Sequence, residues 1–296
     1  MDPNELEKWR KAGKIGSEAL AYAKSIIKPG MKLLDLAEKI ESFIEKKGAS
    51  FAFPINLSKD SVAAHSTPSY NDEEIAEGLL KIDLGVSVDG YISDLTCSVD
   101  LSPGKQYKKL IESSEKALSE AIKLIKPDQT LTVIGKKIQE TISSYGYAPI
   151  INLSGHELKQ YNLHSGLTVP NYDNGNLTKL KEGMILAIEP FATSGSGIVQ
   201  DGKPSGIYKF EEEHNTRDLL AREILKFVQE EYNGLPFSAR WIVKRYGIRS
   251  LFSLRALEQI GSLHHFKQLV EKSHSPVSQA EATVLVTKNG CEVLAS

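Results

Sequence analysis

Cysteine is scarce in this 296-residue chain: Cys97 and Cys291 are the only two, and they lie far apart in apolar segments. Such a pair does not suit a disulfide framework or a zinc–thiolate site, and it fits a reducing compartment. Long apolar runs are missing as well, because no stretch approaches the roughly 18 residues that a membrane span needs. The start of the chain is acidic and polar, unlike a signal peptide. We therefore expect a cytoplasmic protein with no membrane partner.

An excess of either charge is also absent. The chain has 36 Lys and Arg against 38 Asp and Glu, a formal net charge of −2, and no basic tail. Because nucleic-acid-binding surfaces are strongly basic, this balance argues against a nucleic-acid partner. The hydrophobic content of 41% is ordinary for a globular protein. We expect one domain over residues 1–296.

Two aspartates belong to a predicted β-hairpin. The dipeptide Asp89-Gly90 between apolar arms is a strong signal for a two-residue type I′ turn. Counting back from this turn, Gly85 faces Asp94, and Asp83 lies on the same face, diagonally displaced. Two carboxylates that converge from an apolar sheet repel one another unless a cation lies between them. Solvated surface acids are the alternative, but three apolar neighbours favour burial and a metal site: Ile82, Leu84 and Leu95.

The chain also contains a weak internal repeat. Residues 18–48 and residues 116–146 each show a helix, a turn that begins Lys-Pro, and a second amphipathic helix with matching apolar positions. An Asn-Leu-Ser element and a Glu-Gly dipeptide follow in both copies. The repeat places Glu189 at the position of Asp83 and makes Glu281 the best counterpart of Asp94. We therefore expect two similar halves that present acids to a shared pseudo-two-fold axis.

The second half is longer than the first, which indicates an insertion over residues 195–275. Apolar residues at helical spacing predict helices around 216–228, 239–246 and 254–263. Several helices with basic residues could form a winged-helix DNA reader. Acidic residues dilute that charge, and we favour a structural lobe that shapes the rim of a pocket. The acids concerned are Glu230, Glu231 and Glu258.

Three of the seven histidines lie in contexts that indicate a site. His156 follows a glycine at the end of the second Asn-Leu-Ser element, His65 lies in the segment after the first one, and His164 precedes a Ser-Gly pair. A single histidine of this kind is more often structural than a ligand. Three of them beside four carboxylates indicate a functional site. We expect packing or surface roles for the other four: His214, His264, His265 and His274.

The acids and His156 together resemble the five-ligand dinuclear site of the pita-bread fold metallopeptidases. The closest likeness is to the methionine aminopeptidases of the second type, archaeal ones in particular, and it covers nearly the whole chain. The motifs that carry it are Phe53-Pro54, Asn56-Leu57-Ser58, Ala64-His65, Thr67-Pro68, Ile82-Asp83-Leu84-Gly85, Asp89-Gly90, Ser154-Gly155-His156 and Ala187-Ile188-Glu189-Pro190-Phe191. The resemblance implies an α+β pita-bread fold with duplicated halves, an antiparallel sheet covered by helices, and a helical insertion subdomain at 195–275.

The same resemblance assigns metal ligands. Asp94 and Glu281 would bridge two divalent ions, Asp83 would complete the shell of one ion, and His156 with Glu189 that of the other. Such an oxygen-rich set suits Mn, Fe, Co or Zn. The implied activity is removal of the N-terminal methionine from peptides and nascent proteins, with a metal-activated hydroxide attacking the first peptide bond. Glu189 would also take the proton of the water.

Two histidines and an apolar pocket would meet the substrate. By the resemblance, one of His65 and His164 would hold the scissile amide, and the other would donate to the developing oxyanion. Pocket-forming positions of the family correspond to Phe53, Leu163 and Phe191. Phe266 and Leu269 are additional candidates for this pocket, with ordinary core packing as an equal alternative.

Two other functions stay open from the sequence. An Xaa-Pro peptidase of the same fold usually carries an extra N-terminal domain and lacks this insertion. A non-catalytic pita-bread binding protein would have lost ligands, whereas all five positions here have coordinating side chains. The implied partners are peptide or nascent-protein N-termini, with which a transient ribosome contact is compatible. We expect a monomer.

Overall fold

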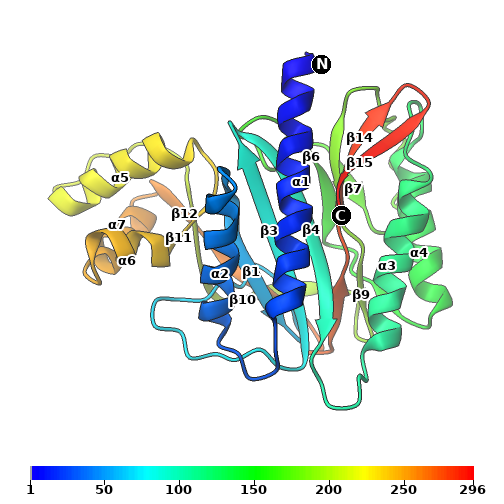
Figure 1. Cartoon of the computed structure of the whole chain (residues 1–296), viewed down its shortest axis with the longest axis horizontal. Coiled ribbons are helices and arrows are strands. Elements are labelled where there is room, and N and C mark those ends of the chain that lie inside the picture. Colours follow the sequence, from blue (N-terminus) through cyan, green and yellow to red (C-terminus); the bar gives the residue numbers. More distant parts are fainter. Residues whose placement is uncertain (1) are drawn as a thin grey trace.

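The computed structural model describes residues 2–296 (Figure 1). Its helices are α1 (Pro3–Ile26), α2 (Leu33–Lys46), α3 (Lys108–Ile122), α4 (Leu131–Ser144), α5 (Leu219–Tyr232), α6 (Ala239–Tyr246) and α7 (Ser250–Gln259). Its strands are β1 (Ser50–Lys59), β2 (Val62–Ala64), β3 (Leu79–Val88), β4 (Tyr91–Asp100), β5 (Ala148–Pro149), β6 (Ser154–Leu158), β7 (Thr168–Pro170), β8 (Ile185–Ile188), β9 (Phe191–Thr193), β10 (Val199–Phe210), β11 (Phe237–Ser238), β12 (Leu263–Glu271), β13 (Val277–Gln279), β14 (Ala282–Thr287) and β15 (Gly290–Ala295).

The first half is an antiparallel sheet in the order β1-β3-β4, covered by α1 and α2 (Figure 1). Asp2 caps α1 in a capping box with Glu5, which satisfies donors that the first turn leaves free. The buried face of α1 recurs at helical spacing and includes Ala12, Ala19 and Ala23, whose small side chains allow close approach to the sheet. The helices therefore cover one face of the sheet and leave its other face toward the centre of the molecule.

The predicted hairpin is confirmed in its turn and in its register. Asp89 and Gly90 both have positive φ, 52° and 83°, as a type I′ turn requires. Gly85 pairs with Asp94, and Asp83 pairs with Thr96. Because paired residues share a face, Asp83 and Asp94 project from the same side of the sheet.

The second half repeats the plan of the first. Its antiparallel sheet has the order β15-β14-β8-β6-β7. Two consecutive helices, α3 and α4, pack on this sheet, as α1 and α2 pack on the first one. Buried Ala117 and Ile138 from these helices contact the same apolar cluster as Leu186 and Val284 from the sheet. The two halves meet where Thr283 Oγ1 accepts the backbone N–H of β4 at 2.7 Å, so β14 lies against β4.

The segment 195–275 contains three helices close to the expected positions, but it is not helical throughout. It begins and ends with the long antiparallel pair β10 and β12, and β12 also pairs with β2 of the first half. Strand β10 was not predicted from the sequence, because its middle, residues 200–206, is polar, contains a proline and glycines, and shows no apolar alternation. Helix α7 lies four residues upstream of the expected 254–263, since Gly261 has positive φ and Leu263 already starts a strand.

Helices α5, α6 and α7 lie together at one side of the molecule, and α3 and α4 lie at the opposite side (Figure 1). The first group buries its own apolar cluster, which includes Ile224, Phe237, Leu254 and Leu257. None of the helices within residues 2–296 combines the length and the apolar composition that crossing a membrane would require.

Candidate active site

Five side chains from both halves converge at the centre of the molecule. Asp83 and Asp94 come from β3 and β4. Glu189 directly follows β8 and Glu281 directly precedes β14, and the pairing of Ala282 with Ile188 brings these two glutamates opposite one another. His156 on β6 pairs with the residue two before Glu189, so its ring projects from the same face.

The ligand atoms of Asp94, His156 and Glu281 all lie within 4.8 Å of one another. His156 Nε2 lies 3.6 Å from Asp94 Oδ2 and 3.6 Å from Glu189 Oε1, which is too long for a hydrogen bond. Asp83 lines the same cavity. The structure thus gathers all five side chains for which the sequence predicted a metal-ligand role.

Burial and mutual repulsion dominate the electrostatics of this cluster. Asp94, His156 and Glu281 are 4%, 6% and 3% exposed. Burial raises the pKa of Asp83 to about 7. Burial, and then the neighbouring carboxylates, raise the pKa of Asp94 and of Glu189 well above their ordinary values. The pKa of Glu281 is raised for the same two reasons.

A divalent cation fits this arrangement. Asp83 Oδ1 and Asp94 Oδ1 are buried without a hydrogen-bond partner among the described residues, and such orphaned acceptors are costly unless something binds them. Burial, and then His164, lower the pKa of His156 to about 3, so its imidazole is neutral and free to donate a lone pair. Four carboxylates and one neutral imidazole form a donor set suited to a transition-metal dication.

Three polar residues that the sequence analysis missed support this cluster. Thr96 Oγ1 donates to Glu281 Oε2 at 2.7 Å, and Thr283 Oγ1 donates to the backbone carbonyl of Asp94 at 2.8 Å. Gln279 Nε2 lies 3.4 Å from the carboxylates of both Glu189 and Glu281. Each of the three lies two residues from an acid on the same strand or strand extension, and that same-face spacing was the available signal.

A cavity of about 260 Å³ opens directly on the cluster. All five residues that the sequence proposed for a methionine pocket line it: Phe53, Leu163, Phe191, Phe266 and Leu269. The sequence missed other lining residues, which include Ala64, Ile207 and Pro236. Ile207 and Pro236 belong to the insertion, and no sequence signal placed them at the cavity.

His65 and His164 line the same cavity and are both held in the neutral form. Burial lowers the pKa of His65. Burial, followed by electrostatic repulsion from the neighbouring His65 and Lys209 side chains when they are protonated, lowers the pKa of His164 to about 4. His65 Nδ1 lies 3.3 Å from the carbonyl oxygen of Lys267. A carbonyl only accepts, so Nδ1 carries the proton and Nε2 is left as an acceptor. The ring of His164 packs edge-on against His156, with centroids 4.4 Å apart.

Comparison with known proteins identifies the family of this chain. Residues 7–287 match the model of metallopeptidase family M24. The methionine aminopeptidase of Methanocaldococcus jannaschii is 42% identical over 295 residues, covering 99% of each chain, and that of Thermococcus onnurineus is 40% identical, covering 98% of this chain and 99% of its own. The structure of the methionine aminopeptidase from Rickettsia prowazekii, at 21% identity, superposes with a TM-score of 0.73 over 100% of this chain and 98% of that one. The expected α+β pita-bread fold is confirmed, and the chain belongs to metallopeptidase family M24.

Proposed function

We propose that this protein is a metal-dependent methionine aminopeptidase. The observation that carries the proposal is the convergence of four carboxylates and His156 on one cavity that also has apolar walls. The near-full-length relatives named above as methionine aminopeptidases support the substrate. The substrates are peptide and nascent-protein N-termini, with which action in the cytoplasm and a transient contact with the ribosome are compatible.

The five gathered side chains would hold two divalent ions of Mn, Fe, Co or Zn. Their ligands would come from Asp83, Asp94, His156, Glu189 and Glu281, which line one cavity. When bound, such ions supply Lewis acidity, which activates water and polarises the carbonyl of the first peptide bond. Thr96 and Gln279 orient the glutamates through the hydrogen bonds described above, so the carboxylates are positioned before any ion arrives.

The residues around the metal site have distinct tasks in this reaction. His65 presents an unprotonated Nε2 and accepts the N–H of the scissile amide. His164, neutral at physiological pH, donates its ring N–H to the carbonyl oxygen as negative charge develops there. Glu189, whose pKa is raised by burial and by Glu281, takes the proton that the attacking water loses and passes it to the departing amine.

The cavity accounts for exopeptidase specificity. Phe53, Phe191 and Phe266 provide an apolar wall of a size that suits one unbranched thioether side chain. The acids beside the cavity attract a free α-ammonium group, which favours binding of a peptide by its N-terminus.

The deciding experiment compares a Met-Ala-Ser peptide with an Ala-Pro-Ser peptide. The protein is stripped of metal and assayed with Mn or Co, with a chelated sample as control. The proposal expects metal-dependent release of methionine from the first peptide alone. Cleavage before proline would indicate an Xaa-Pro peptidase instead of a methionine aminopeptidase. No hydrolysis with either metal would favour a non-catalytic binding protein.

A further inference from the structure

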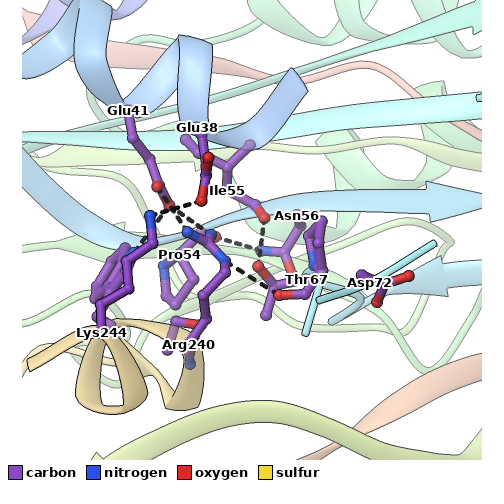
Figure 2. A network of polar contacts seen from close by, with 12 residues as sticks. Glu38, Glu41, Pro54, Ile55, Asn56, Thr67, Asp72, Arg240 and Lys244 are labelled. Carbon is purple, nitrogen blue, oxygen red and sulfur yellow. Dashed lines mark hydrogen bonds and ion pairs between the residues drawn. The ribbon is translucent and has the colours of Figure 1, made fainter. Parts of the chain in front are cut away.

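A buried ion pair joins the insertion to the first half of the molecule. Arg240 on α6 donates from Nη1 and Nη2 to the two carboxylate oxygens of Glu41 on α2, at 2.9 and 2.7 Å. Figure 2 shows Arg240 reaching toward Glu41 from the insertion. Arg240 is 1% exposed and Glu41 is 6% exposed. Trp241 Nε1 donates to the same carboxylate at 2.9 Å, so Glu41 is fully satisfied.

The third donor of Arg240 goes elsewhere. Its Nε donates to the carbonyl oxygen of Pro68 at 3.2 Å. Pro68 ends the segment 65–68, which begins with His65 at the cavity. We call residues 65–68 the His65 segment. A single guanidinium therefore holds α2, α6 and the His65 segment in one fixed geometry.

Neighbouring strands anchor the middle of the His65 segment. The backbone N–H of Leu57 on β1 donates to the carbonyl of Ser66 at 2.6 Å. Thr67 Oγ1 donates to the carbonyl of Ile55 at 2.8 Å (Figure 2), and Gln268 Nε2 on β12 donates to Ser66 Oγ at 3.0 Å. The end of the segment is tied to helix α6 of the insertion by the guanidinium.

The backbone of His65 needs such restraint. Its φ is +58°, in the left-handed region, which is unfavourable for a non-glycine residue. Strained backbone persists only where the surrounding structure over-determines it. If the His65 segment loosened, His65 would relax toward the ordinary region, and its ring would leave both the carbonyl of Lys267 and its place at the cavity.

We propose that Arg240 is a positioning residue, which keeps His65 in its strained conformation by tying the end of the His65 segment to Glu41. Net stability is a poor explanation for the pair, because desolvation of two buried charges offsets most of their attraction. The inference rests on the proposed function, since it takes His65 to act on the substrate. If Arg240 has this role, the packing of the insertion against α2 helps to set the position of His65 in the active site.

The test is Arg240→Lys, combined with a His65→Ala background. Lysine keeps the charge opposite Glu41, but one ammonium cannot reproduce the planar fork that reaches both Glu41 and Pro68. We expect kcat to fall by about 10-fold with little change in KM, because a displaced histidine is felt in the transition state. In the His65→Ala background the same change should lower kcat no further. Equal losses in both backgrounds, or an unchanged kcat, would overturn the inference.

Two matched controls touch the same helices without touching the His65 segment. Trp241→Phe removes another donor to Glu41, and Lys244→Met removes the exposed α6–α2 ion pair with Glu38, 2.6 Å long (Figure 2). Both should keep the kcat of the unaltered protein. A tenfold loss in either control would show that α6 docking in general, and not Arg240, sets the rate.

Hydrogen–deuterium exchange gives a readout that is independent of turnover. Amide exchange over residues 64–70 should accelerate in Arg240→Lys and stay unchanged in the two controls; unchanged exchange in Arg240→Lys would contradict the positioning role. If Arg240→Lys does not fold, Thr67→Val releases the same segment from β1 and should reproduce both effects. An inactive unaltered protein would overturn the proposed function, while the exchange experiment would still decide the positioning role.

Discussion

The ring of Phe53 occupies the space that Gly85 leaves open opposite Asp94. A Cβ atom on Gly85 would overlap the Phe53 ring and the side chain of Ala52. The absence of a side chain at Gly85 therefore lets the wall of the apolar cavity approach the strand pair that carries Asp94. The metal cluster and the pocket are thus linked through one position on β3.

Gly85→Ala should therefore damage the pocket more than the metal cluster. The added methyl group pushes Phe53 toward the cavity, and overpacking of this kind costs about 1–3 kcal/mol in the free energy of unfolding. We expect a raised KM for Met-Ala-Ser, with metal affinity retained, measured by steady-state kinetics and calorimetry. Gly290→Ala is the control, because a Cβ there meets no atom within 4 Å. Loss of metal binding with an unchanged KM would contradict this account.

Asp94→Asn should abolish activity and leave the fold intact. Even partners that only orient metal ligands contribute about 10–100-fold, so loss of a bridging carboxylate should cost more than about 100-fold in kcat/KM. In the metal-free protein the same change removes one of several repelling buried charges, and thermal denaturation should show an equal or higher melting temperature. Asp89→Asn, on the exposed turn of the same hairpin, should behave like the unaltered protein. Full turnover by Asp94→Asn would sink the metal assignment.

Metal affinity should rise with pH. The pKa of Asp83 is about 7, and those of the other three carboxyl groups are raised by burial, so protons compete with the cation. As pH falls through 7, the carboxyl groups gain protons that an ion must displace, and binding weakens. Calorimetric titration with Mn at pH 6 and pH 8, in two buffers of different ionisation enthalpy, should show weaker binding and more protons released at pH 6. Equal affinity and no proton release at both pH values would contradict the raised pKa values of these carboxyl groups.

His65→Ala and His164→Ala should lower kcat while leaving metal binding in place. Removing a positioned group that exchanges hydrogen bonds or protons with the reacting atoms typically costs about 10²–10⁴-fold. Neither side chain belongs to the metal cluster, so calorimetry with Mn should match the unaltered protein. His274→Ala, an exposed histidine of the same chain, serves as the control. Lost metal affinity in either active-site variant would instead make that histidine a ligand.

Glu271 should stabilise the base of the insertion in a pH-dependent way. Burial alone would raise its pKa, but donors from Ser196, Ser273 and Ser275 lower it to about 2. Because the folded pKa lies below the unfolded value, this stabilisation is present above about pH 4.3 and is lost as pH falls toward 2. Glu271→Gln should reduce the free energy of unfolding in urea by about 1–3 kcal/mol at pH 7, with a smaller difference at pH 3.

Glu213→Gln, an exposed acid of the same segment, is the matched control for this stability effect. Its unfolding free energy should equal that of the unaltered protein at both pH values. A Glu271→Gln variant as stable as this control at pH 7 would show that the hydrogen bonds to the serine residues contribute nothing net.

Local sequence patterns were sufficient to predict the hairpin geometry and most of the acid cluster. Asp89-Gly90 set the turn, and strict alternation along the strands then put Asp83 and Asp94 on one face without any tertiary information. The internal repeat extended this reasoning to Glu189 and Glu281, because two similar halves must present equivalent positions to their common axis. Local dihedral preferences and side-chain period are short-range properties, which is why sequence patterns carry them.

The surroundings of those residues depend on contacts between segments that are distant in the chain. The polar middle of β10 gives no periodic signal, so its pairing with β12 and the entry of Ile207 into the cavity depend on long-range contacts. The same holds for Arg240, because its hydrogen bonds join it to Glu41 and Pro68, which lie far away in the chain. Two further features depend on packing between segments whose proximity no local pattern encodes. They are the positive φ of His65 and the position of the Phe53 ring beside Gly85.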